Sequence, residues 1–187
     1  MKALLVVDVQ KDFCPGGSLA VPNGDEVAAY INKKIAEAVH GAYIFSFDCH
    51  PDNHCSFVEQ GGPWPKHCVA GTKGFELHDD LKVPTDRLAT MIFKGMDLDF
   101  DSYSAFADDG GKKTELEAFL KAYDITELDV VGLATEYCVK FSVLDGLKAG
   151  LRINVLMEGC RGLSTKDINA ATQEMMEAGA FIIDSEK

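Results

Sequence analysis

The stretch Ala-Leu-Leu-Val-Val-Asp-Val, residues 3–9, indicates the fold class of this chain of 187 residues. A strand that is apolar at almost every position is buried on both faces, which is typical of a parallel sheet covered by helices. Similar runs recur along the chain, at residues 42–48, 89–93, 128–133, 152–157 and 180–183. We therefore expect these runs to form the strands of one sheet.

The segments between the runs show the spacing of amphipathic helices, with apolar residues three or four positions apart. The sets are Val27, Ile31, Ile35 and Val39; Leu116, Phe119, Leu120 and Tyr123; Val139, Val143, Leu144 and Leu147; and Ile168, Ala171, Met175 and Met176. Strands that alternate with helices form βαβ units. The sequence thus predicts an α/β fold, a three-layer sandwich with a central, mostly parallel six-stranded sheet and helices on both faces.

The length of the chain favours a single domain over residues 1–187. One segment, residues 51–87, breaks the alternation and holds four of the six prolines, the only tryptophan and three of the five histidines. An irregular segment of this length inside a compact domain is usually functional. We interpret it as a metal-bearing insertion that covers a pocket.

Charge and composition exclude several classes of partner. The formal net charge is -12, from 30 acidic and 18 basic residues, and a protein this acidic repels nucleic acids and anionic membrane surfaces. The apolar run before Asp8 is too short for a signal peptide, and no stretch reaches the roughly 20 apolar residues that span a bilayer. We expect a cytoplasmic protein in which most of the six cysteines are free thiols, since they show no paired spacing.

Polar residues stand at or just past the ends of several predicted strands. They are Asp8, Asp48, Lys94 and Cys138. Open α/β sheets bind their ligands outside the carboxyl ends of the strands. If the strands are neighbours, these four side chains meet at one edge of the sheet.

Cys138 has the features of a nucleophile. It falls in the first turn of a helix that we expect to begin near Glu136, where the helix dipole favours a thiolate. Asp8 could take the thiol proton, and Lys94 would keep Asp8 ionised. The residues alone also allow a structural cysteine beside a buried Asp8–Lys94 ion pair.

A second cluster suits a metal ion. Asp48 and His50 are two positions apart, so in an extended chain both side chains project the same way, and His67 could supply a third ligand. Such a set binds divalent zinc, iron or manganese. His54 is either a fourth ligand or a residue that orients Ser56. The alternatives are solvated loop histidines, or a structural zinc site that uses Cys49, Cys55 or Cys68.

Six stretches, in order along the chain, carry a resemblance to a known family. They are LLVVDVQKDFCPGGSL (4–19), Asp48-x-His50-Pro51, Trp64-Pro65-x-His67-Cys68-Val69, Phe93-Lys94-Gly95, DSYSAF (101–106) and VGLATEYCV (131–139). Together they resemble the nicotinamidases, which are isochorismatase-like cysteine hydrolases. Each motif alone is weak, but the set in this order is specific.

The resemblance implies a catalytic triad of Asp8, Lys94 and Cys138. It places the metal on Asp48, His50 and His67, with His54 a fourth ligand in some relatives; zinc is the expected metal, and iron and manganese are alternatives.

The resemblance also implies a cis peptide bond between Leu133 and Ala134. That bond would turn the Ala134 amide toward an oxyanion hole shared with the amide of Cys138. Phe13 and Trp64 would hold a pyridine ring between them and Tyr103 would close the pocket, with Leu133 and Ala134 completing the substrate-binding set.

The function so implied is a metal-dependent amidohydrolase of NAD salvage that converts nicotinamide to nicotinate and ammonia through a thioester. The alternatives are a metal-independent amidase for an N-carbamoyl compound, which would keep the triad, a vinyl-ether hydrolase acting on isochorismate, which usually lacks the cysteine, and a non-catalytic metal-binding protein. Nicotinamide is the expected partner, and the oligomeric state, a homo-oligomer included, stays open.

Thr135 stands where a helix N-cap would, and its hydroxyl could compete for the Cys138 amide. We expect it to cap the Tyr137 amide instead, or the helix to start one residue later. Gly146 interrupts a predicted helix, at a cost of up to about 1 kcal/mol.

Overall fold

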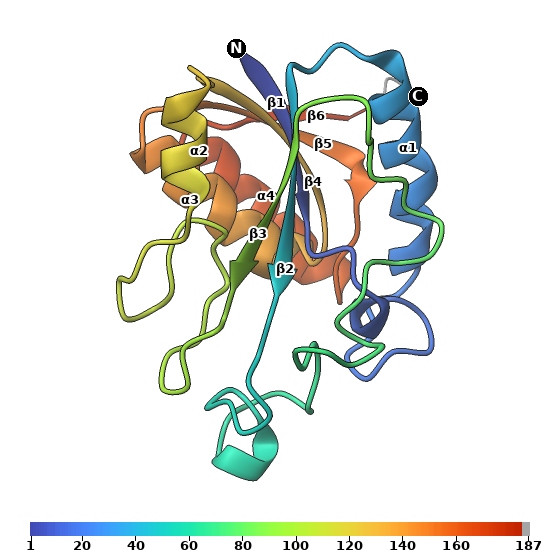
Figure 1. Ribbon diagram of the computed structural model, residues 1–187, viewed down its shortest axis with the longest axis vertical. Helices are drawn as coiled ribbons and strands as arrows, with labels where there is room; N and C mark the ends of the chain where they lie inside the picture. Colours follow the sequence, from blue (N-terminus) through green and yellow to red (C-terminus); the bar gives the residue numbers. More distant parts are fainter. Residues whose placement is uncertain (185–187) are drawn as a thin grey trace.

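A six-stranded sheet with the strand order β3-β2-β1-β4-β5-β6 forms the centre of the molecule (Figure 1). The structure is a computed structural model and describes residues 1–184. All strand pairs are parallel, which confirms the predicted sheet. The strands are β1 (Lys2–Val7), β2 (Ala42–Asp48), β3 (Ala89–Lys94), β4 (Glu127–Gly132), β5 (Arg152–Cys160) and β6 (Phe181–Ile183).

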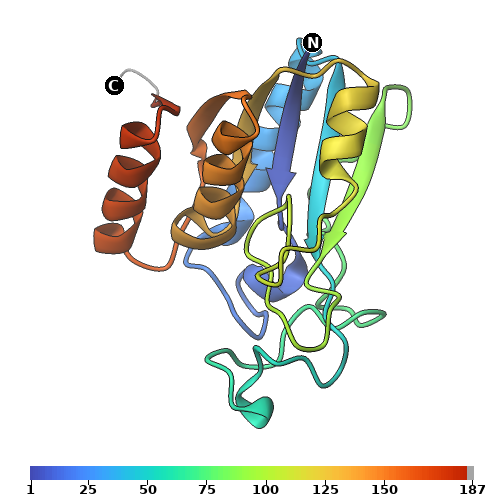
Figure 2. The same cartoon turned by 90° about the vertical axis from the view of Figure 1, so that its left-hand side faces the viewer.

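Helices cover both faces of the sheet, as predicted (Figure 2). Helix α1 packs on one face through Val27, Ile31 and Ile35. Helices α2, α3 and α4 cover the other face. Their bounds are Val27–Glu37 for α1, Leu116–Ala122 for α2, Lys140–Lys148 for α3 and Thr165–Glu177 for α4. No helix among residues 1–184 is long and apolar enough to cross a membrane.

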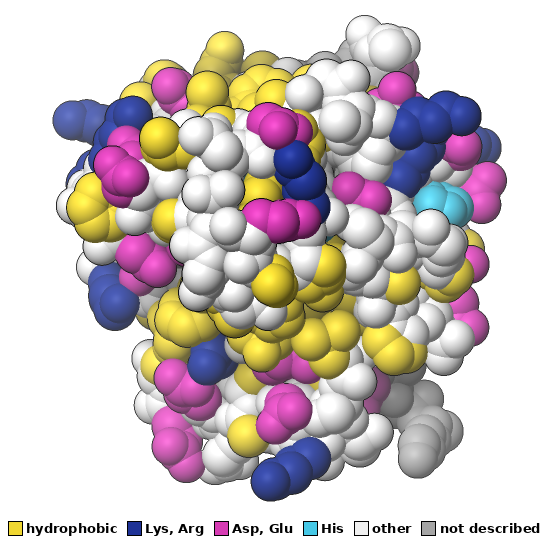
Figure 3. All heavy atoms as spheres, turned by 90° about the horizontal axis from the view of Figure 1, so that it is seen from below, with side chains coloured by type: hydrophobic (Ala, Val, Ile, Leu, Met, Phe, Trp, Pro, Cys, Tyr) yellow, Lys and Arg dark blue, Asp and Glu magenta, His cyan; other side chains and the backbone are white. Residues whose placement is uncertain are grey.

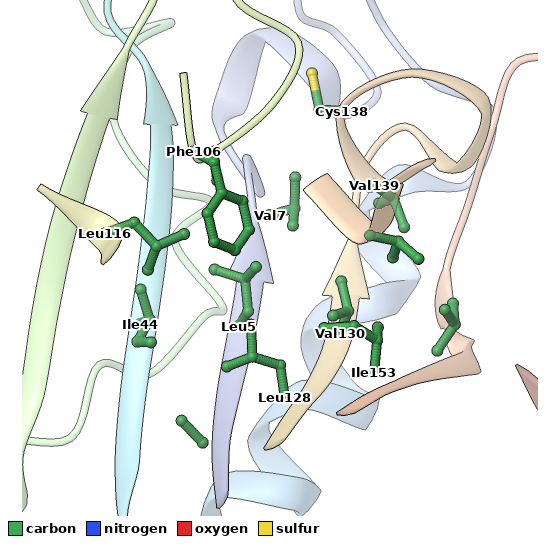
Figure 4. Packing of buried hydrophobic residues seen from close by; sticks show 14 of the residues in the cluster. Leu5, Val7, Ile44, Phe106, Leu116, Leu128, Val130, Cys138, Val139 and Ile153 are labelled. Carbon is green, nitrogen blue, oxygen red and sulfur yellow. The ribbon is translucent and has the colours of Figure 1, made fainter. Parts of the chain in front are cut away.

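The core lies on both sides of β1, because successive side chains of a strand point to opposite faces. Leu5 and Val7 belong to the cluster under α2, α3 and α4, whereas Leu4 and Val6 pack against the side of α1. Figure 4 shows the first cluster, with Cys138 at its edge and its sulfur directed away from the other labelled side chains. Burial of both faces explains the unbroken apolar run that indicated this strand.

Strand β1 ends two residues earlier than the sequence run predicts. Asp8 has a φ of 46°, in the left-handed region, and this turns the chain out of the sheet. From β1 the chain adds β2 and β3 on one side of the sheet and β4, β5 and β6 on the other, so the strand order reverses beside β1. Ligands of open α/β sheets bind at such a switch point.

The irregular connection from β2 to β3 contains one short 3-10 helix, Val58–Gln60. Much of this connection lies beyond the carboxyl ends of the strands, which point downward in Figure 1. It therefore lies where it can cover the switch point.

Candidate functional site

The residues from three different elements meet where β1 ends. Asp8 follows β1, Lys94 is the last residue of β3, and Cys138 lies in a π-helix, Thr135–Val139, that follows β4. The Lys94 Nζ atom is 2.9 Å from Asp8 Oδ2 and 3.4 Å from Cys138 Sγ. The sulfur also lies within 4.8 Å of a carboxylate oxygen of Asp8. The structure thus brings the predicted triad together, with all three residues buried.

Asp8 is held in place on both sides of its carboxylate. The Ser46 hydroxyl donates a hydrogen bond of 2.6 Å to Oδ1, while Lys94 faces Oδ2. Burial raises the pKa of Asp8, and the Lys94 ammonium opposes this rise. A carboxylate with a raised pKa is a better proton acceptor, so Asp8 is suited to act as a general base.

Lys94 is buried with several acceptors around its ammonium group. It contacts the Asp48 carboxylate and donates a hydrogen bond of 2.7 Å to the Ser102 carbonyl oxygen, in addition to facing Asp8. Burial lowers the pKa of Lys94, but the Asp48 and Asp8 carboxylates outweigh it and hold the pKa well above its usual range. Lys94 therefore keeps its positive charge beside the sulfur.

Cys138 does not lie in the first turn of a regular α-helix. Tyr137 has φ -118° and ψ -105°, which interrupts the helical path, and α3 begins only at Lys140. Burial raises the pKa of the Cys138 thiol well above its usual range, although Lys94 opposes the rise. Burial thus favours the neutral thiol, which needs a base to become a nucleophile.

The cis peptide bond between Leu133 and Ala134 is present, as the resemblance predicts. Within residues 1–184 no hydrogen bond occupies the Ala134 amide. The predicted cap by Thr135 is absent: its buried hydroxyl has no hydrogen-bond partner in this part of the chain, and the Tyr137 amide donates to the Ala134 carbonyl oxygen at 3.0 Å. Thr135 thus takes no amide away from an oxyanion.

A group of potential metal ligands adjoins the triad. Oδ2 of Asp48 is 3.5 Å from Nε2 of His50 and 3.7 Å from Nε2 of His67. Ligand atoms that each lie about 2.1 Å from one ion are separated by roughly 3.0–3.5 Å. The spacing therefore suits a divalent metal.

The hydrogen bonds of the two histidines prepare them for this role. Nδ1 of His50 donates to the Gly95 carbonyl oxygen at 2.9 Å, and Nδ1 of His67 donates to the Pro65 carbonyl oxygen at 2.7 Å. Since a carbonyl oxygen only accepts, the hydrogen of each neutral imidazole is on Nδ1, and each Nε2 atom then has a free lone pair, as in metal-binding histidines. Nε2 of His50 is buried without a hydrogen-bond partner in residues 1–184. These residues fit a metal ion.

Gly95 makes room for this arrangement. A Cβ atom at this position would lie 2.5 Å from Cε1 of His50, and the φ of 66° is one that glycine adopts readily. The Phe-Lys-Gly motif therefore contributes to both clusters, because Lys94 contacts Asp8 and Cys138, and Gly95 makes room for His50, a potential metal ligand.

His54 lies next to the potential metal ligands, but its ring nitrogens contact other groups. Its Nδ1 is 2.7 Å from the Ser56 hydroxyl and its Nε2 is 3.1 Å from the Phe100 carbonyl oxygen. Its ring forms a set of potential metal ligands with His50 and Asp101, whose ligand atoms all lie within 4.8 Å of one another, and Asp48 does not belong to this set. These contacts match the interpretation in which His54 orients Ser56. Among the described residues, no candidate metal group contains Cys49, Cys55 or Cys68.

A pocket opens above Cys138. Its lining includes the predicted Phe13, Trp64, Tyr103 and Ala134. The prediction that Leu133 binds substrate is wrong. Leu133 is fully buried and does not line the pocket, since its side chain packs in the core on the α1 side of the sheet. The face onto which the strands point carries a band of hydrophobic side chains (Figure 3).

The aromatic wall of the pocket is held by polar contacts. The indole Nε1 of Trp64 donates a hydrogen bond of 2.9 Å to the Tyr103 hydroxyl, and burial raises the pKa of Tyr103 to about 12. The pocket has about 420 Å³ of empty space, part of it open to solvent. An apolar slot of this kind suits a flat ring whose reactive group reaches Cys138.

Sequence reasoning missed five lining residues, which are Leu19, Val21, Asp101, Tyr137 and Leu163. Leu19, Asp101 and Tyr137 stand inside the quoted motifs and could have been found there. Leu163 had no signal, because it reaches the pocket through a loop between β5 and α4.

Comparison with known proteins agrees with this site. Residues 2–187 match the family described as the Isochorismatase domain. A nicotinamidase of Escherichia coli is 43% identical over 201 residues, covering 97% of this chain and 93% of that protein. A pyrazinamidase of Pyrococcus horikoshii, solved in complex with zinc, has a TM-score of 0.88 and 37% identity, covering 98% of this chain and 99% of that chain.

An L. infantum protein solved in complex with nicotinate has a TM-score of 0.94 and 36% identity, covering 98% of this chain and 92% of that chain. The resemblance found in the motifs is confirmed over nearly the whole sequence. The chain therefore belongs to the isochorismatase family.

Proposed function

We propose that this protein hydrolyses nicotinamide to nicotinate and ammonia, with Cys138 as the nucleophile. The observation that carries the proposal is the meeting of a thiol, a carboxylate and an ammonium group beneath an aromatic pocket. The similarity to nicotinamidases, one of them 43% identical, supports this substrate.

The reaction begins when Asp8 takes the proton of Cys138. The sulfur attacks the carboxamide carbon, and the electron pair of the C=O bond moves to the oxygen. The amides of Ala134 and Cys138 hold that oxyanion, an interaction typically worth about 3–4 kcal/mol per donor. Lys94 stays protonated and stabilises the negative charge of Asp8 and of the sulfur.

The intermediate collapses when Asp8 returns the proton to the leaving nitrogen, which departs as ammonia and leaves a thioester. Asp8 then accepts a proton from a water molecule, which attacks the thioester carbon. Collapse of this second intermediate breaks the C–S bond and releases nicotinic acid, which gives its remaining proton to the solvent and becomes nicotinate. The thiolate regains its proton from Asp8, so the protein returns to its starting state.

Asp48, His50 and His67 would hold a divalent metal, and zinc is our choice because the P. horikoshii relative was solved with it. A bound metal would supply a Lewis acid that attracts the pyridine nitrogen of the substrate. The ligand set also favours the nicotinamidase over an N-carbamoyl amidase, which would need no metal. Phe13 and Trp64 would orient the ring.

The test is release of ammonia from nicotinamide by purified protein, with and without a chelator. Cys138→Ala should lower turnover by more than about a thousandfold without unfolding the protein. Cys160→Ala, which removes a buried thiol that does not line the pocket, should keep activity. Turnover by Cys138→Ala would exclude this nucleophile, and zinc-loaded protein that leaves nicotinamide intact would exclude this substrate.

A further inference from the structure

Gln10 is a completely buried polar residue at the site, and the reaction above gives it no part. It stands in the first of the quoted motifs, two positions after Asp8. Burying a side-chain amide is costly unless its donors and acceptor are all satisfied. Its partners therefore show what it does.

All hydrogen-bonding groups of the Gln10 side chain go to main-chain atoms. Nε2 donates to the carbonyl oxygens of Asp48 and Phe75, each at 2.8 Å. Oε1 accepts the Asp48 amide hydrogen, also at 2.8 Å. The side chain thus pairs with both the N–H and the C=O of Asp48, as a neighbouring strand would.

This pairing replaces a missing part of the sheet. Strand β1 ends at Val7 because Asp8 turns away, whereas β2 continues to Asp48. On its other side β2 still pairs with β3, where Asp48 stands opposite Lys94. Without Gln10, the last residue of β2 would lose its partner on the β1 side.

Asp48 is the residue that both functional groups share. One oxygen of its carboxylate contacts Lys94, and the other faces His50 and His67 at 3.5 Å and 3.7 Å. A displacement of its main chain would move that carboxylate relative to both histidines.

We propose that Gln10 is a positioning residue of the metal site, which fixes the main chain of Asp48 and joins it to Phe75 in the covering insertion. The inference rests on the proposed metal site, but not on the substrate. Outer partners of metal ligands typically contribute a factor of 10–100 in metal affinity.

The variant Gln10→Met keeps the length of the side chain and removes its hydrogen bonds. We expect it to lower the affinity of metal-free protein for zinc by about 10–100-fold, measured by competition with a chromophoric chelator in the absence of substrate. Gln10→Asn, which keeps an amide but is too short to reach all partners, should cause a smaller loss and serves if Gln10→Met does not fold.

Asn32 offers a matched control. Its side-chain amide makes a similar pair of bonds to the same insertion, donating to the Asp80 carbonyl oxygen at 2.7 Å and accepting from the Lys82 amide at 2.9 Å. None of these residues belongs to a candidate metal group in the described chain. Asn32→Leu should lower the melting temperature of the metal-free protein but leave zinc affinity within about twofold.

Two results would overturn the role of Gln10: unchanged zinc affinity in both Gln10 variants, or an equal loss in Asn32→Leu. If the unaltered protein binds no zinc, the metal site itself is wrong and the inference fails with it. If zinc binds and Gln10→Met weakens it while nicotinamide is not cleaved, the role of Gln10 stands and the proposed substrate fails.

Discussion

Position 8 makes two demands on one residue. Its main chain has a φ of 46°, which asparagine and aspartate adopt more readily than other non-glycine residues. Its side chain must accept from Ser46 and face Lys94 inside a fully buried space. Aspartate meets both demands, whereas glutamate has the right charge with the wrong length and main-chain preference.

Asp8→Asn should therefore remove the base with little change of shape. We expect turnover to fall by about 100–10,000-fold, the usual contribution of a general base, while the far-ultraviolet circular dichroism spectrum stays the same. Asp8→Glu should also lose activity, and in addition unfold at a lower urea concentration than Asp8→Asn. Equal urea midpoints for the two variants would show that the main-chain demand is unimportant.

The meeting of Asp8, Lys94 and Cys138 could be predicted from the sequence, because each residue interrupts or lies just past an apolar run that forms a strand. Thr135 and Leu133 were assigned wrongly for a common cause. Both follow the last residue of β4, where the chain leaves the sheet and enters a π-helix in place of a regular α-helix. Periodicity carries no information about such a backbone.

Among the elements, helix α3 contains a glycine, Gly146, that has little free space around it. A Cβ atom at Gly146 would lie 2.9 Å from Cδ1 of Ile153 and 3.4 Å from Cζ of Phe106. The helix packs closely against β5 at this point. The first of these atoms is the free end of a side chain and can move by a small rotation.

Gly146→Ala should raise the free energy of unfolding by less than about 1 kcal/mol, because the gain in helix propensity exceeds the cost of shifting one methyl group. Gly146→Val should lower it by about 1–3 kcal/mol through overpacking. Urea unfolding measures both, and ammonia release should be unchanged in Gly146→Ala. A loss of stability in Gly146→Ala would mean that Ile153 cannot move.

The elements themselves were well predicted, since every expected strand and helix is present. Their ends were less certain from sequence. Strand β5 extends to Cys160, beyond the apolar run at 152–157, because it continues beside β4 past an irregularity between Val130 and Gly132. Such an extension depends on a neighbouring strand, which no local pattern encodes.

At the scale of the whole molecule, a buried polar network links the sheet to the end of α1, away from the pocket. Asp129 of β4 accepts from Asn154 at 2.7 Å, and it faces His40 at 2.9 Å and Lys2 at 2.7 Å. Burial raises the pKa of Asp129, but the bonds from these three partners outweigh it and lower the pKa to about 2.

This network should contribute to stability against acid. The pKa of Asp129 in the folded protein is about 2, below the ordinary value of 3.8, so its contribution is present above pH 3.8 and is lost as the pH falls through 2. The shift corresponds to about 2 kcal/mol. The stability difference between the unaltered protein and Asp129→Asn should therefore shrink between about pH 4 and pH 2 in urea unfolding. A difference that is constant over this range would contradict the assignment.

The double contact of Asp48 limits how this chain can diverge during evolution. Its carboxylate neutralises Lys94 on one side and faces two imidazoles on the other. A descendant that discarded His50 and His67 would still need an acid at position 48, because the lysine would otherwise keep only one counter-ion. Loss of the proposed metal site in this lineage should thus leave that aspartate in place.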